Sequence, residues 1–370
     1  MSINILAGLI FIGVFGIVIL VHEFGHFFVG KFFKVEIEEF GIGLPPKMLS
    51  LFRWKETEFT INWLPIGGFN RFKGENNPEV EGGLAAASPG VRLAVLFAGA
   101  IINLLTGILV YTIIFSRIGI PNFDVIQIHE VTPGSPAAEA GFRVDDIILK
   151  INGEVFNREA EMRGIIGDNI DKEISFTLQR GEEIVETVAV PLSSRSAEEG
   201  ALGFVPSYER KESSSFFEIL SFGTQTTFLH AQEILLMPAR MLRGSLSPEE
   251  GRFIGFRGIY NIFQQTVDAD VESREEETKP STETPAPPPT YYTLNLIASL
   301  TITLGVFNLL PFPALDGGRI FFIIPELLFK KRVPAEFENI VHGVGMMLLL
   351  GFMLYINVMD FVNPVDILLP

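Results

Sequence analysis

The sequence predicts an α-helical integral membrane protein with four transmembrane helices and a small α+β domain between the second and third. Its 370 residues are 48% hydrophobic, yet the formal net charge is −16. A protein with evenly mixed residues is rarely so apolar and so acidic at once, so the charges must be separated from long apolar runs. A strongly acidic chain also argues against a nucleic-acid partner, which requires a basic surface.

Four uncharged runs have the length of a bilayer span, for which about 20 residues suffice, with a range of roughly 17–25. No basic segment precedes the first run and no small-residue cleavage site follows it, so we expect a retained helix and not a signal peptide. The runs are Ile5–Val21, Leu93–Phe115, Leu294–Leu310 and Val341–Met359. The corresponding predicted helices occupy residues 1–30, 91–116, 293–318 and 340–360.

Lys and Arg residues in the short loops predict the orientation. The segment 31–92 contains eight of them, and the loop 319–339 contains four. We therefore expect both segments on the cytoplasmic side of a bacterial inner membrane. Both chain ends and the long segment 116–293 are then expected outside.

The long outer segment has three parts of different composition. Residues 122–206 alternate short β-like runs with Pro-Gly and Asn-Gly turns, which predicts one small α+β domain. Residues 213–267 have the apolar spacing of amphipathic helices, which could lie beside the membrane or pack on the small domain. Residues 268–292 are rich in Glu, Pro, Thr and Ser, which predicts a flexible acidic linker.

The first apolar run ends in the motif His22-Glu23-Phe24-Gly25-His26, an H-E-x-x-H sequence. One helical turn separates His22 and His26, so both side chains can bind one metal ion. Zinc lowers the pKa of its water to about 7, and Glu23 can take up the proton. Ionisable residues inside an apolar helix are costly, which favours a functional role.

A catalytic zinc site requires a third protein ligand, and the chain has no cysteine. The predicted orientation places the end of the third helix on the same side as His22 and His26. There the sequence Asn308-Leu-Leu-Pro-Phe-Pro-Ala-Leu-Asp316-Gly-Gly has Asp316 as its one acidic residue. Pro311 and Pro313 break the helix. We therefore predict Asp316 as the third ligand of Zn²⁺. His129, His230 and His342 are predicted to be ordinary surface or interfacial residues.

With these motifs, the chain resembles the site-2 family of intramembrane zinc metalloproteases, in its bacterial PDZ-containing branch. The resemblance implies that His22, His26 and Asp316 bind zinc and that Glu23 is the general base. The element Gly99-Ala-Ile-Ile-Asn103 is similar to a G-x-x-x-N motif of the family. Asn103 and Asn308 would then position the substrate or stabilise the oxyanion, although helix–helix hydrogen bonding is an alternative.

The resemblance also implies two accessory parts. Residues 31–90 look like the membrane-associated β-loop of the family, and residues 122–206 look like one PDZ domain. The PDZ domain could bind a trimmed substrate terminus or exclude bulky substrates. An edge strand in the β-loop could capture an extended substrate by strand addition. The alternating pattern selects Glu58, Phe59, Thr60, Ile61, Asn62 and Trp63 for this strand.

The sequence therefore predicts a zinc endopeptidase that cleaves transmembrane segments of other membrane proteins within the lipid bilayer. Envelope stress signalling and clearance of signal peptides are both compatible roles. Two alternatives are a non-catalytic PDZ scaffold, which would be expected to have a damaged metal site, and a metal transporter. A transporter would be expected to have polar residues spaced across the bilayer, whereas these residues cluster at one depth.

Overall fold

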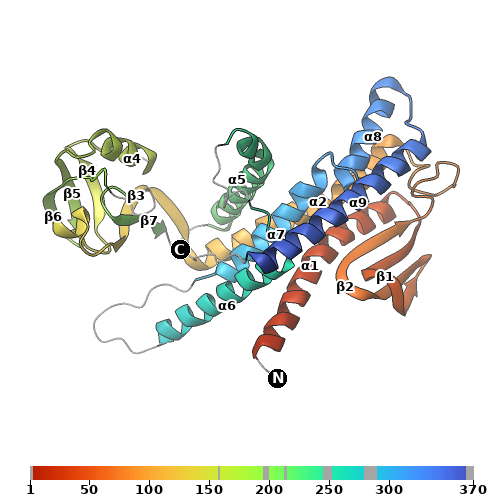
Figure 1. The fold of residues 1–370 in the computed structure, drawn as a ribbon, viewed down its shortest axis with the longest axis horizontal. Coiled ribbons are helices and arrows are strands. Elements are labelled where there is room, and N and C mark those ends of the chain that lie inside the picture. Colours follow the sequence, from red (N-terminus) through yellow and green to blue (C-terminus); the bar gives the residue numbers. More distant parts are fainter. Residues whose placement is uncertain are drawn as a thin grey trace. The chain divides into compact units, whose positions relative to one another are not determined.

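The computed structural model describes residues 3–156, 159–194, 200–211, 215–244, 252–278 and 290–363. The chain divides into two compact units. One unit is Ser116–Phe216, and the other contains Met1–Phe115 together with Phe217–Pro370 (Figure 1). The second of these contains all the long apolar helices and the predicted metal ligands.

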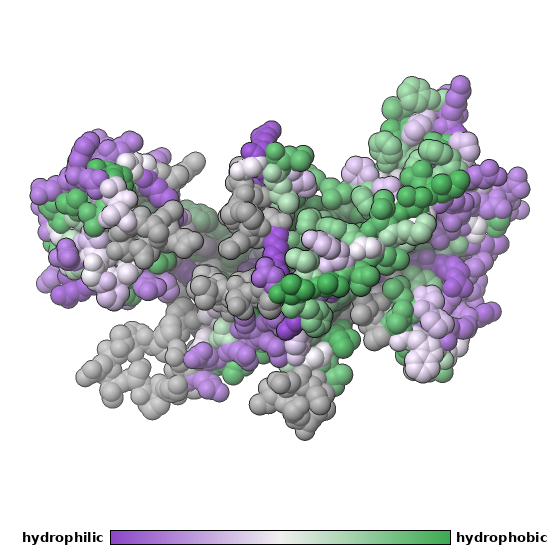
Figure 2. All heavy atoms as spheres, viewed as in Figure 1, coloured by the Kyte–Doolittle hydropathy of each residue, from purple (hydrophilic) through white to green (hydrophobic). Residues whose placement is uncertain are grey.

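In the part of the chain that the structure describes, four helices are long and apolar enough to cross a membrane. Fewer than half of the residues in the most apolar part of each helix are buried by the protein itself, as expected for helices whose side chains contact lipid. Figure 2 shows hydrophobic residues along the visible side of this helical unit. The prediction of four candidate membrane helices is confirmed. They are α1 (Ile3–Phe32), α2 (Pro89–Ile118), α7 (Tyr292–Leu309) and α9 (Ala335–Val362).

The third of these helices ends before the predicted metal ligand. Pro311 and Pro313 follow α7, and the chain forms a short loop before helix α8 begins at Asp316. α8 (Asp316–Phe329) is formed by the apolar stretch of sequence between the third and fourth long helices. A salt bridge between Arg92 of α2 and Glu326 of α8 links these two helices. The first turn of α8 therefore lies close to the C-terminal end of α7.

Glycines bring α1, α2 and α7 close together. A Cβ atom at Gly25 of α1 would lie 2.5 Å from the carbonyl oxygen of Ala98 in α2. One at Gly305 of α7 would lie 3.1 Å from the carbonyl oxygen of Ala100. Small residues at helix–helix contacts allow the two backbones to approach closely, which increases the van der Waals packing between membrane helices. α2 therefore lies against both other helices.

The segment after α1 forms a sheet from two long, bent strands, β1 (Ile37–Trp54) and β2 (Thr57–Phe72). Each of the two long strands contributes two segments to the sheet, and we call these four strand segments rows. The pairing register places the rows side by side in the order 47–54, 57–62, 37–42 and 68–72. Phenylalanines attach the sheet to α1, since the ring of Phe40 lies 4.8 Å from Phe24 and 5.5 Å from Phe27. This contact determines which part of the sheet faces the H-E-x-x-H motif.

The prediction that Glu58–Trp63 forms an edge strand is wrong. Phe59 pairs with Phe40 on one side and with Phe52 on the other, and Glu58, Thr60 and Ile61 likewise have partners on both sides. The alternating sequence indicated a strand with two different faces, but it contained no information about neighbouring strands. Among the described residues, the outer sides of rows 47–54 and 68–72 carry no paired strand.

Within the described residues of the unit Ser116–Phe216, five strands form an antiparallel sheet that is accompanied by two short helices. Its core includes Phe142 and Phe176, whose rings pack edge to face at 5.0 Å. The final strand was not predicted, and it extends the sheet beyond residue 206. The elements are β3 (Ile120–Val131), α3 (Pro136–Glu139), β4 (Ile147–Ile151), α4 (Glu159–Asp168), β5 (Ile174–Arg180), β6 (Glu183–Ala189) and β7 (Phe204–Lys211).

Two helices follow this unit, α5 (Phe216–Leu242) and α6 (Phe256–Thr278). The two buried residues of α5 are Gly223 and Thr227. A Cβ atom at Gly223 would lie 2.8 Å from Oγ1 of Thr112. The hydroxyl of Tyr111 lies 3.0 Å from Nδ1 of His230. α5 therefore packs on helix α2, a contact that neither of the two positions considered from the sequence had specified.

The predicted flexible linker begins too early. Residues 268–278 are helical and belong to α6, and the remainder, 279–289, lies outside the described residues. Asp270 is buried and accepts hydrogen bonds from the backbone N–H groups of Tyr292 and Thr293 at 2.8 and 3.0 Å. These donors belong to the first turn of α7, where a carboxylate satisfies unpaired N–H groups. The acidic composition of residues 268–292 suggested disorder, whereas the carboxylate of Asp270 is hydrogen-bonded to the first turn of α7.

Candidate metal centre

The structure brings together the three predicted metal ligands. His22 and His26 lie one turn apart on α1, and their side chains are 5% and 8% exposed. Their Nε2 atoms are 3.1 Å from each other. Oδ2 of Asp316, at the start of α8, lies 3.2 Å from Nε2 of His22 and 3.1 Å from Nε2 of His26. Three potential ligand atoms therefore converge on one buried point.

This arrangement fits a tetrahedral zinc site. Zn–N and Zn–O bonds of about 2.0–2.2 Å at tetrahedral angles separate ligand atoms by roughly 3.3 Å. The observed separations of 3.1–3.2 Å are close to that value. The ring of His26 donates from Nδ1 to the carbonyl oxygen of Val95 at 2.8 Å, which leaves the lone pair of Nε2 for a metal. With two imidazoles and one carboxylate, a fourth position remains available for water or substrate.

Asn103 lies behind His22. Its side chain is fully buried, and its amide nitrogen is 3.4 Å from Nδ1 of His22. When Nε2 of an imidazole binds metal, Nδ1 carries hydrogen and needs an acceptor. The amide oxygen of Asn103, which has no partner in the described residues, can accept that hydrogen after a half-turn of the amide. This position favours orientation of His22 over direct contact with substrate.

Glu23 lies next to the sheet. Its carboxylate accepts a hydrogen bond from Nδ2 of Asn70 at 2.8 Å, and the same nitrogen donates to its backbone carbonyl. A Cβ atom at Gly68 would lie 3.2 Å from Cγ of Glu23, so the chain passes close to this side chain. Row 68–72 of the sheet, and not the predicted segment 58–63, therefore lies at the H-E-x-x-H motif.

Asn308 has a local partner. Its Nδ2 donates to the carbonyl oxygen of Leu304 in the preceding turn of α7 at 3.0 Å, and the residue is half-buried. It belongs to the last turn of α7, eight residues before Asp316. The predicted role of Asn308 toward substrate stays a prediction.

Sequence reasoning missed Asn70 and Val95. Val95 contributes a backbone carbonyl to His26, and a carbonyl group has no signature in the sequence. Asn70 reaches Glu23 across 47 positions of the chain, and only the pairing of the sheet places it there. Neither residue could have been selected from local spacing.

Gly99 of α2 supplies the space for both imidazoles. A Cβ atom there would lie 2.4 Å from Nε2 of His26 and 2.6 Å from Cε1 of His22. We expect Gly99→Ala to lower zinc affinity about tenfold, because overpacking of this size costs about 1–3 kcal/mol. Chelator competition on the purified protein measures the change.

Gly90→Ala is the matched control for this substitution, since a Cβ at Gly90 of the same helix meets no atom within 4 Å. Equal zinc affinity of the two variants would contradict the close packing of α2 against the histidines.

Comparison with known proteins places this geometry in a family. The pattern of Peptidase family M50 matches residues 10–352. The zinc metalloprotease RasP of Oceanobacillus iheyensis is 25% identical over 434 residues, covering 93% of this chain and 96% of the relative. The metalloprotease MmpA of Caulobacter vibrioides is 28% identical over 373 residues, covering 92% of each chain.

A further relative, a candidate zinc metalloprotease of Fusobacterium nucleatum, is 30% identical over 352 residues, covering 94% of this chain and 96% of its own. The similarity therefore extends over almost the whole length of each protein. Together with the four membrane helices and the zinc-compatible cluster, it identifies the chain as a member of peptidase family M50, the site-2 protease family of membrane zinc metalloproteases.

Proposed function

We propose that this protein is an intramembrane endopeptidase that hydrolyses peptide bonds within or near transmembrane segments of other membrane proteins. The observation that carries the proposal is the convergence of His22, His26 and Asp316, with Glu23 adjacent, inside a bundle of apolar helices. Ionisable groups at such a position are costly unless they serve a function. Zinc metalloprotease names among the relatives support the same chemistry.

The residues have distinct proposed roles. His22, His26 and Asp316 hold Zn²⁺, which supplies a Lewis acid that polarises a carbonyl group and acidifies water. Glu23 takes the proton of the attacking water and delivers it to the departing amine nitrogen. Asn70 keeps the Glu23 carboxylate in place for both transfers. Asn103 fixes the ring of His22, and Asn308 is the remaining candidate for support of substrate or oxyanion.

Substrate capture is proposed at row 68–72 of the sheet. A helical substrate must unwind before attack, because its carbonyl groups are engaged in its own hydrogen bonds. An extended segment can pair with an open strand side, and row 68–72 has such a side. The contacts of Asn70 and Gly68 with Glu23 support this choice, because they place this row beside the proposed base.

The orientation and the outer domain complete the proposal. Lys and Arg residues of segments 31–92 and 319–339 support a site that opens toward the cytoplasm of a bacterial cell. The unit Ser116–Phe216 is then an extracytoplasmic PDZ-type domain, which binds a substrate terminus or excludes large substrates. Regulated proteolysis in envelope stress signalling and clearance of signal peptides both fit such an enzyme.

The intact site argues against the two alternative functions. A non-catalytic scaffold would have no need for three ligand atoms 3.1–3.2 Å apart. A transporter would need a succession of polar sites across the bilayer, whereas the described cluster of metal ligands occupies one level.

The proposal is tested with the full-length protein purified in detergent. We expect about one zinc ion per chain and cleavage of a model transmembrane substrate at a bond near its cytoplasmic end. Mass spectrometry of the products gives the position of the bond. Cleavage confined to a soluble loop far from the transmembrane segment would contradict the proposed substrate class.

A further inference from the structure

Helix α9 is buried against the rest of the described chain at two residues near its opposite ends. Only Gly345 and Asp360 are buried among its residues, and most of its large apolar side chains are exposed. Asp360 accepts hydrogen bonds from the N–H groups of Gly255 and Gly258 at 2.8 and 3.0 Å. Gly345 lies near the opposite end, beside the loop that precedes Asp316. α9 is thus fastened at two points and has few buried contacts between them.

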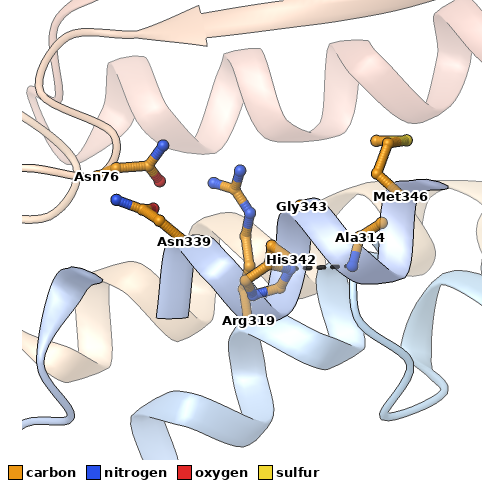
Figure 3. A pocket seen from close by; sticks show the side chains of 7 residues that line it. All are labelled: Asn76, Ala314, Arg319, Asn339, His342, Gly343 and Met346. Carbon is orange, nitrogen blue, oxygen red and sulfur yellow. Dashed lines mark hydrogen bonds between the residues drawn. The ribbon is translucent and has the colours of Figure 1, made fainter. Parts of the chain in front are cut away.

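At the point near Asp316, α9 supports the loop very closely. A Cβ atom at Gly345 would lie 2.3 Å from Cβ of Pro313. No other residue type could bring the helix backbone this near to the proline without displacing it. One turn earlier, Nδ1 of His342 accepts a hydrogen bond from the N–H group of Ala314 at 2.9 Å. Figure 3 shows this bond across the edge of a cavity of about 300 Å³.

The hydrogen bond acts on a strained residue. Ala314 has φ +79°, a left-handed conformation that an alanine adopts at a cost of about 1–2 kcal/mol. Ala314 is two residues before Asp316, so its backbone conformation determines where the aspartate begins α8. Nε2 of the same imidazole is buried and makes no hydrogen bond within the described residues. The polar contact of His342 with the loop is therefore the one at Nδ1.

We propose that His342 is a positioning residue for the metal centre. Its Nδ1 holds Ala314 in the left-handed conformation, and Gly345 admits the loop against α9, so that Asp316 is presented to His22 and His26. The inference rests on the proposed function, because it assumes that Asp316 is a zinc ligand. The proposal gives α9 a part in orienting a metal ligand, although none of the three proposed ligands belongs to this helix.

The test compares His342→Leu with His342→Asn in the full-length protein. Asparagine places an acceptor oxygen near the position of Nδ1, whereas leucine fills similar space without an acceptor. We expect His342→Leu to raise the zinc dissociation constant about tenfold, a size known for residues that orient ligands. His342→Asn should restore most of the affinity. Chelator competition is the main measurement, and thermal unfolding of the zinc-free variants monitors their folding.

The control is Asn339→Ala, which alters another residue of α9 that lines the same cavity. It should leave zinc affinity unchanged. If His342→Leu and His342→Asn lose affinity equally, or if neither loses any, the proposed hydrogen bond does not position Asp316. Failure of the proposed function would be distinguishable, because then the unaltered protein would bind no zinc, or Asp316→Ala would bind it as tightly.

Discussion

Replacement of Glu23 by glutamine is expected to abolish peptide-bond cleavage while leaving zinc bound. The amide has nearly the same shape as the carboxylate but cannot take up a proton, so the water that attacks the peptide loses its base. General base catalysis contributes typically 10²–10⁴-fold, and we expect a fall in kcat of about 10³-fold or more. The measurement is cleavage of a model transmembrane substrate together with zinc analysis of the same sample.

The matched control for Glu23→Gln is Glu38→Gln, which removes an exposed carboxylate from the neighbouring strand β1. It should cleave at the rate of the unaltered protein. Retention of both zinc and full activity by Glu23→Gln would show that another group is the base. Loss of zinc by this variant would instead assign Glu23 to the metal ligands.

Replacement of Asp316 by alanine should remove zinc and activity together. His22 and His26 remain one turn apart on α1, but two imidazoles without the carboxylate leave two positions of a tetrahedral site unfilled by protein. Loss of a residue that only orients a ligand already costs 10–100-fold in metal affinity, so loss of a ligand should exceed about 100-fold. Chelator competition, followed by metal analysis, measures this change.

Glu336→Gln provides the control for Asp316→Ala, since Glu336 is an exposed carboxylate in the first turn of α9. It should keep the zinc affinity of the unaltered protein. If Asp316→Ala retained full zinc occupancy, the assignment of the third ligand would be wrong, even though Oδ2 lies 3.1 and 3.2 Å from the two imidazoles.

The membrane helices were predictable because their signal is local. An uncharged run of the right length has few other stable locations, and the described residues contain four such helices. The metal ligands were also accessible from the sequence. The spacing of His22 and His26 is a property of one helix, and the distribution of loop charges predicted that Asp316 lies at the same level.

The sheet shows why other predictions failed. Alternation along 58–63 indicated a strand, but its position in the interior of the sheet depends on pairing with 37–42 and 47–54. The acidic residues 268–278 suggested a disordered linker, yet Asp270 is buried at the first turn of α7. In both cases the partner is another segment of the chain, which no local pattern specifies.

The sequence by itself predicted the class of protein, the candidate membrane helices and the three candidate ligand side chains, because these follow from composition, from spacing within one helix and from the charges of the loops. Only the tertiary structure decided which groups lie against these side chains, against Glu23 and against the loop before Asp316. Val95 contributes a carbonyl group, Asn70 a side chain on a paired strand, Gly99 a missing Cβ atom, and His342 a contact between α9 and the loop. These effects arise from the packing of separate segments, where a displacement of about 1 Å is enough to impair a catalytic site.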